Sequence, residues 1–175
     1  MTRTITACAT AAAAAVLLLG IGAAAAQTPA TAKAAMKDAQ GKALGTVTLQ
    51  QHPHGVVIRG ELDNVAPGWH AVHIHAVGKC EPDFAAAGGH FNPTNAKHGM
   101  GAAEMHAGDL PNFFVDERGH ARFEMMTHRV SLTDGPSNVF DADGASLIVH
   151  AGVDDYATDP AGNSGNRIAC GVIAK

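Results

Sequence analysis

LGTVTL at residues 44–49 and VVIRGEL at residues 56–62, on either side of the turn residues HPHG at 52–55, decide the fold of this chain. Apolar and polar residues alternate in both runs, which is the pattern of half-buried β-strands. Strand patterns return at residues 69–75, 112–115, 121–126, 145–150 and 168–173, and no stretch after residue 30 shows capped helical periodicity over ten residues. Several short strands with close turns predict an all-β sandwich or barrel.

The length and composition fit one globular domain and exclude two broad classes. The chain has 175 residues, of which 46% are hydrophobic and 16% are charged, so it can build a core and is not disordered throughout. The formal net charge of −4 argues against a nucleic-acid binder that depends on overall basicity. The count of 11 histidines, against 12 Lys and Arg together, raises the expectation of metal binding.

The first 26 residues read as a secretory signal peptide. Arg3 precedes an apolar stretch at 11–21, and four alanines precede Gln27, where cleavage is expected. The apolar stretch is shorter than the ~20 residues that a membrane span needs, so the chain should leave the membrane after cleavage and reach the periplasm. We expect residues 27–33 to be a flexible segment, with mobility across 28–35, and the folded domain to occupy 34–175.

The long irregular region at 76–111 needs cross-links to be ordered inside a compact domain. Cys80, His90, His98, His106 and Asp109 all lie within it and could supply those links. Three imidazoles and one carboxylate, spaced by eight, eight and three residues, suit tetrahedral Zn²⁺ and leave no open position, as in a structural site. The competing interpretation is a polar loop with unrelated histidines.

A second set of histidines lies on predicted strands. His73 and His75 stand two residues apart, so their side chains share a strand face with Trp69, and His70 points to the other face as a hydrogen-bonded core residue. His150 ends an apolar strand. His73, His75, His90 and His150 together would make an imidazole-rich copper site.

Other polar residues complete this sequence-based picture. Asp154 or Asp155 could accept the free ring N–H of a ligand histidine. The pair His52 and His54 lies in a predicted turn, where a solvated hairpin tip explains it better than a metal site. Only two cysteines remain after signal cleavage, and in an exported protein they most simply form one disulfide.

Five motifs in order resemble the Cu/Zn superoxide dismutases in their exported bacterial form, over about residues 34–175. They are GWHAVHIH at 68–75, GHFNP at 89–93, KHG at 97–99, MHAGDL at 105–110 and GNRIACGVI at 165–173. The resemblance implies an eight-stranded antiparallel Greek-key barrel, an immunoglobulin-like sandwich, with a long metal-binding loop.

The same resemblance implies roles for individual residues. It assigns copper to His73, His75, His90 and His150, and zinc to His90, His98, His106 and Asp109, with one ion of each per chain and His90 as the bridge. It implies a Cys80–Cys170 disulfide, a guanidinium of Arg167 that holds the anionic substrate beside copper, and an Asp154 carboxylate that links the two ligand sets.

The implied activity is dismutation of superoxide to dioxygen and hydrogen peroxide, in protection of the cell envelope. The alternative is a non-enzymatic periplasmic protein that binds copper or zinc, although such a protein has no use for Arg167 beside the metals. Two features depart from the family pattern: residues 81–86 look like an insertion between Cys80 and His90, and the loop at 151–166 has no lysine. Because this subloop forms part of the eukaryotic dimer interface, a homodimer is an option that cannot simply be carried over.

Overall fold

The computed structural model describes residues 28–100 and 104–175, together with Met1, and shows the predicted all-β fold. The predicted signal peptide lies outside this part of the chain apart from Met1. One short 3-10 helix, η1 (Phe84–Ala87), is the one helical element among the described residues. None of the described helical structure is long and apolar enough to cross a membrane. The strands are β1 (Thr31–Asp38), β2 (Ala43–His52), β3 (Gly55–Leu62), β4 (Gly68–His70), β5 (Val72–His75), β6 (Phe113–Val115), β7 (Ala121–Thr127), β8 (Ser146–His150) and β9 (Arg167–Ala174).

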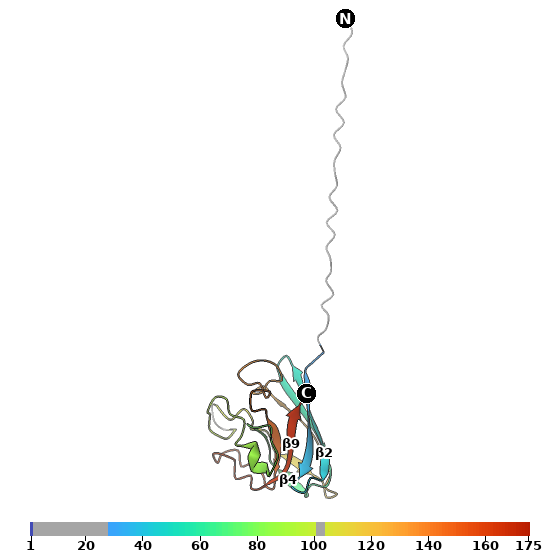
Figure 1. Ribbon diagram of the computed structural model, residues 1–175, viewed down its shortest axis with the longest axis vertical. Helices are drawn as coiled ribbons and strands as arrows, with labels where there is room; N and C mark the ends of the chain where they lie inside the picture. Colours follow the sequence, from blue (N-terminus) through green and yellow to red (C-terminus); the bar gives the residue numbers. More distant parts are fainter. Residues whose placement is uncertain (2–27, 101–103) are drawn as a thin grey trace.

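Antiparallel pairing joins seven of these strands into one curled sheet (Figure 1). Seven strands follow the order β5-β8-β9-β1-β2-β3-β7, and β4 pairs with β6 alone. The hairpin β2–β3 turns at Pro53 and His54, with His52 opposite Gly55. Since β1 pairs with both β2 and β9, and β8 lies between β5 and β9, the chain crosses over between distant strands as in a Greek key.

The core fills the inside of the curl. β1 alternates exposed and buried residues, so Ala32, Ala34 and Met36 face inward. Every residue of β5 and β8 is buried, since these neighbouring strands also carry the metal-binding region on their outer side. Burial of this apolar surface is the main stabilising contribution to the fold.

The expected mobility of residues 28–35 is wrong from Thr31 onward. β1 begins at Thr31, and Ala34 pairs with Val47 of β2 and with Ile173 of β9. The folded part of the chain therefore starts before the expected boundary at residue 34. Small side chains weaken the local strand signal, but two partner strands supply the hydrogen bonds and the packing that order this segment.

The strand expected at 69–75 is divided at Ala71 into β4 and β5. Ala71 donates its N–H to the Gly152 carbonyl, and its own carbonyl accepts from His150 N–H, so it pairs outside both strands. Before this break Trp69 is 57% exposed and packs edge-on against Phe114. The single shared face predicted for Trp69 and His73 is therefore wrong, because alternation does not continue across the break.

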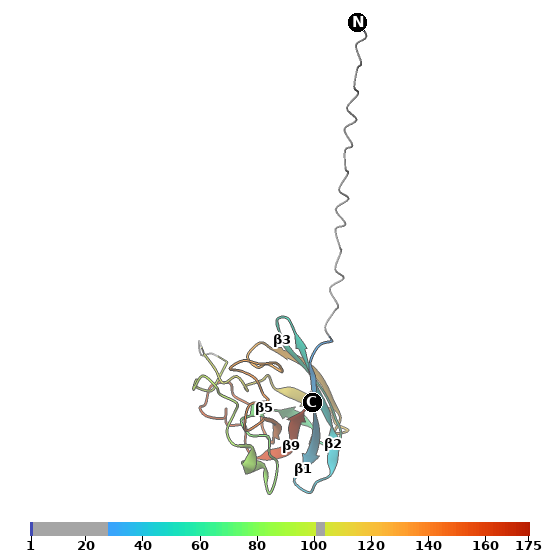
Figure 2. The same ribbon diagram turned by 45° about the horizontal axis from the view of Figure 1, so that its top comes forward.

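Two long loops lie together on one side of the sheet, away from β1 and β2 (Figures 1 and 2). One connects β5 to β6 and contains η1, and the other connects β8 to β9. Their backbones meet directly, since Met100 donates its N–H to the Tyr156 carbonyl. The candidate ligands from distant parts of the sequence come together beneath these loops.

Candidate metal centre

Strands β5 and β8 bring the first histidine group together. His73 and His75 of β5 lie opposite Ile148 and Ser146 of β8, and His150 ends β8. His90 joins them through an isolated bridge to His75. All four histidines are buried, and one nitrogen from each lies within 4.8 Å of the others.

Four orphaned nitrogens show that this group fits a metal ion. Among the described residues, His73 Nδ1 and the Nε2 atoms of His75, His90 and His150 are buried without a hydrogen-bond partner. Their other ring nitrogens are occupied: His73 Nε2 lies 2.7 Å from Asp154, and His75 Nδ1 donates to the Gly88 carbonyl at 2.9 Å. An unpaired buried nitrogen is costly, so converging lone pairs point to a shared cation.

Burial favours the neutral form of three of these imidazoles, and a metal ligand must be neutral. Desolvation lowers the pKa of His75 to about 2 and the pKa of His150 to about 4, and the nearby charges of His90 and Arg167 act in the same direction. Burial also lowers the pKa of His73, against the opposing hydrogen bond to Asp154. The lone pairs of His73, His75 and His150 are thus available to a metal at neutral pH.

The second group lies beside the first and shares His90. Asp109 Oδ1 lies 2.7 Å from His90 Nδ1, 3.0 Å from His98 Nδ1 and 3.3 Å from His106 Nδ1. His106 Nδ1 lies 3.4 Å from His90 Nδ1. Ligand atoms of tetrahedral Zn²⁺, each about 2.0–2.2 Å from the ion, stand roughly 3.3 Å apart. The spacing in this group matches such a site.

The charges in the second group favour a cation. Burial alone would raise the pKa of Asp109, but the hydrogen bond from His90 and the neighbouring histidine charges lower it overall. Burial also lowers the pKa of His106, while the hydrogen bond to Asp154 and the Asp109 charge outweigh burial and raise the pKa of His98. A buried carboxylate stabilised in its charged form among imidazoles is a ready partner for a divalent ion.

His90 belongs to both groups through different atoms. Its Nδ1 faces Asp109, and its Nε2 is one of the orphaned nitrogens of the first group. One imidazole can therefore contact two ions at once, and the ring fixes the separation of the two sites.

Asp154, rather than Asp155, links the two groups. Its Oδ2 accepts from His73 Nε2 at 2.7 Å, and its Oδ1 accepts from His98 Nε2 at 2.9 Å. The Asp155 carboxylate instead accepts bonds from Ala157, Thr158 and Asn163 within its own loop. The two alternatives that the sequence left open are thereby separated by geometry.

Three histidines that the sequence singled out lie outside the two groups, and His52, whose Nε2 is buried without a partner in the described part of the chain, is less solvated than expected. His70 is buried, and its ring nitrogens lie 2.8 Å from the His150 carbonyl and 2.7 Å from the Ala66 carbonyl, so it is the expected hydrogen-bonded core residue. His54 is exposed at the hairpin turn, while His52 is half-buried at the end of β2. Neither of the turn histidines belongs to a group of three or more potential ligands among the described residues.

Arg167 begins β9 beside the first group. Its Nη1 donates to the Phe84 carbonyl at 2.5 Å, and its Nη2 donates to the Gly88 carbonyl at 2.6 Å. The Gly88 carbonyl also accepts from His75, so one oxygen connects the guanidinium to a candidate ligand. The half-buried guanidinium thus has a defined orientation next to the histidines.

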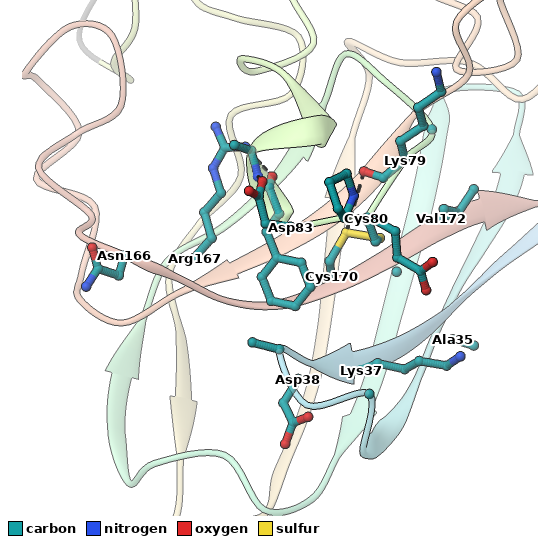
Figure 3. A pocket seen from close by; sticks show the side chains of 18 residues that line it. Ala35, Lys37, Asp38, Lys79, Cys80, Asp83, Asn166, Arg167, Cys170 and Val172 are labelled. Carbon is teal, nitrogen blue, oxygen red and sulfur yellow. Dashed lines mark hydrogen bonds between the residues drawn. A yellow bond between two sulfur atoms is a disulfide. The ribbon is translucent and has the colours of Figure 1, made fainter.

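A disulfide joins Cys80 and Cys170, 90 residues apart in sequence. Cys170 is buried in β9, three residues after Arg167, and Cys80 lies in the loop that carries η1 (Figure 3). The predicted disulfide is confirmed. It ties the segment that supplies the Phe84 and Gly88 carbonyls to the strand that supplies the guanidinium.

Sequence reasoning missed several groups that hold the candidate ligands in place. The Asn112 side chain makes two hydrogen bonds to the Asp154 backbone. Its Nδ2 donates to the Asp154 carbonyl and its Oδ1 accepts from Asp154 N–H, each at 2.9 Å. Its position three residues after Asp109 was the available signal. The carbonyls of Phe84 and Gly88 that accept from Arg167 could not be predicted from the sequence, because every residue carries a carbonyl.

Gly108 and Gly162 allow close approach at the centre. A Cβ at Gly108 would stand 2.1 Å from the Ile74 carbonyl oxygen of β5 and 2.9 Å from the Phe91 backbone nitrogen. At Gly162 a Cβ would stand 1.9 Å from Asp154 Oδ1, and its φ of 61° also favours glycine. Both positions require the absence of a side chain.

Known proteins are similar to this chain over most of its length. Residues 43–173 match the family model described as copper/zinc superoxide dismutase (SODC). A Cu-Zn superoxide dismutase of Aquifex aeolicus is 44% identical over 144 residues, covering 80% of this chain and 85% of that protein. A Cu-Zn superoxide dismutase of Caulobacter vibrioides is 44% identical over 148 residues, covering 82% and 85%.

A solved structure agrees with these sequence matches. A SOD-like protein from Bacillus subtilis superposes with a TM-score of 0.76 at 38% identity, covering 80% of this chain and 96% of that one. The matched residues 43–173 include both ligand groups, the disulfide and Arg167. The fold, both ligand groups and the family match therefore agree. The chain belongs to the copper/zinc superoxide dismutase family.

Proposed function

We propose that the chain dismutes superoxide at a histidine-bridged centre, with copper held by the first group and zinc by the second. His73, His75, His90 and His150 would hold copper, and His90, His98, His106 and Asp109 would hold zinc. The observation that carries the proposal is His90, whose two nitrogens face two separate four-ligand groups. A bound copper ion supplies one-electron redox chemistry, and zinc supplies a redox-silent positive charge.

The residues around the first group would handle the anion and the proton. The two carbonyl contacts use two of the five N–H groups of Arg167 and leave its positive charge beside the histidines, where it can orient superoxide. His90 Nε2 is buried without a hydrogen-bond partner among the described residues, so in a protonated form it could donate a proton to the departing peroxide. Asp154 fixes the tautomers of His73 and His98 by accepting both Nε2 protons.

This reading is supported over a non-enzymatic metal carrier. A carrier would use the same histidines but gains nothing from a guanidinium beside them, because a cation opposes binding of another cation. The decisive test loads the mature chain with copper and zinc and follows superoxide consumption by stopped-flow spectroscopy. We expect turnover that disappears on chelation and returns with copper; stoichiometric binding of both metals without turnover would establish the carrier instead.

We infer that the protein is exported to the periplasm and loses residues 1–26. Support comes from the signal-like sequence and from the Cys80–Cys170 disulfide, a bond that persists in oxidising compartments. Sequencing the N-terminus of protein from a periplasmic fraction should give Gln27. A homodimer is the partner arrangement to test, by sedimentation equilibrium of the same material.

A further inference from the structure

The subloop between Cys80 and His90 carries a carboxylate next to the guanidinium that would hold the substrate. Asp83 is the N-cap of η1, and its Oδ1 accepts from Ala85 N–H at 2.9 Å. Figure 3 shows Asp83 and Arg167 on the same side of the disulfide, at a groove of about 910 Å³ that both residues line. An acidic residue here is unexpected beside a site for an anion.

The cap matters because η1 carries both acceptors of Arg167. Phe84 is the first residue of η1, and Gly88 is its C-cap, with a φ of 72° and an N–H that donates to the Ala85 carbonyl. The guanidinium bonds to the carbonyls of these two residues, one at each end of the helix. The position of η1 therefore sets where both acceptors of the guanidinium lie, and the Gly88 carbonyl extends this contact to His75.

Asp83 also acts through its charge. Asp83 and Arg167 line the same groove, and the Asp83 charge opposes the lowering of the pKa of Arg167 that burial causes. Arg167 makes no ion pair within 4.0 Å among the described residues, so the carboxylate leaves the guanidinium free to meet another anion. A negative charge on the wall of the same groove weakens the local attraction for anions.

We propose that Asp83 is a positioning residue for the anion site: it caps η1 and thereby holds the two carbonyls that orient Arg167, while its charge limits anion attraction. This inference rests on the proposed role of Arg167. The two effects have opposite signs, because loss of the cap should weaken anion binding and loss of the charge should strengthen it.

Three substitutions separate the two effects. D83N and D83S remove the charge and keep a side-chain oxygen that caps well, whereas D83A removes both. The anion probe is azide, titrated against the copper- and zinc-loaded protein by its visible absorption change. Glu81→Gln is the matched control, since Glu81 is an exposed carboxylate of the same subloop that lies outside η1.

At about 10 mM ionic strength, where exposed charges are weakly screened, we expect D83N and D83S to bind azide about 2-fold more tightly than the wild type. This gain should vanish near 0.5 M salt, which screens exposed charges beyond roughly 4 Å. D83A should bind azide about 3- to 5-fold more weakly than D83S, the factor expected from a lost N-cap. Amide exchange at Ala85 should accelerate in D83A and stay unchanged in Glu81→Gln.

Two results would overturn the inference. Equal azide affinities for D83A and D83S would remove the positioning role, and equal affinities for D83N and the wild type at low salt would remove the charge effect. Arg167→Ile, titrated alongside, keeps this failure separate from that of the proposed function. If Arg167→Ile leaves azide binding unchanged, the role of Arg167 itself is wrong. If Arg167→Ile weakens azide binding but the Asp83 variants bind azide like the wild type, only this inference fails.

Discussion

Removing the Cys80–Cys170 bond should destabilise the protein strongly, because the bond closes a large loop. The two cysteines are 90 residues apart. The chain-entropy model gives a loop of this length about 4.6 kcal/mol of stabilisation at 25 °C, through restriction of the unfolded chain. For a domain of this size, that loss corresponds to a melting temperature lower by about 10–20 °C.

The assay is thermal and urea unfolding of the double variant Cys80→Ala/Cys170→Ala against the wild type. Both are measured at one fixed concentration of free copper and zinc, because ions that bind the folded state add to apparent stability. A reductant should lower the wild-type stability toward that of the variant and leave the variant unchanged. Thiol labelling of the denatured, unreduced wild type should find no free thiol among the mature cysteines.

A loss of stability below about 1 kcal/mol would refute this reasoning. It would mean that the unfolded chain is already restricted, or that β9 and the subloop stay together without the bond. Two reactive thiols in the untreated wild type would refute the pairing itself.

Three further predictions concern the metal centre. His98→Ala or Asp109→Ala should reduce zinc from one ion per chain to near zero while copper is retained, as measured by elemental analysis; zinc retained in both variants would contradict the ligand assignment. Arg167→Ile should keep both metals but lose roughly 10- to 150-fold in rate, the equivalent of a charged hydrogen bond of about 1.5–3 kcal/mol, and the wild-type rate should fall with salt; an unchanged rate at low salt would contradict the role of Arg167. The metal-free protein should lose stability as the pH falls below 6.5, because His75 and His150 stay neutral when folded, with pKa values of about 2 and about 4, but take up protons when unfolded. By pH 4, His75 and His150 should each lower the free energy of unfolding by about 3 kcal/mol. The raised pKa of His98 acts in the opposite direction, and urea unfolding between pH 4 and 8 measures the total.

The sequence by itself determined the fold class and the members of both ligand groups. Alternation at 44–49 and 56–62 is a property of neighbouring residues, and it reappears as β2 and β3. The members of both ligand groups could be named in advance, because imidazole and carboxylate are recognisable by residue type and spacing. Cys80 and Cys170 are the two cysteines that follow the predicted signal peptide, so their pairing could be predicted from the sequence alone.

The tertiary structure decided what depends on distant partners. β1 is ordered by pairing with β2 and β9. The small residues after Thr31 give only a weak local strand pattern, so the sequence did not predict these pairings. The linking carboxylate is Asp154, because only its oxygens reach both His73 and His98.

The orientation of the Arg167 side chain also could not be predicted from the sequence. It depends on carbonyls of Phe84 and Gly88, about 80 residues away in the chain, and backbone acceptors are the same in every residue. Residue type and local spacing can therefore predict which side chains serve chemistry. Which atom meets which partner depends on long-range packing, because contacts across the sheet and loops join positions that local patterns do not relate.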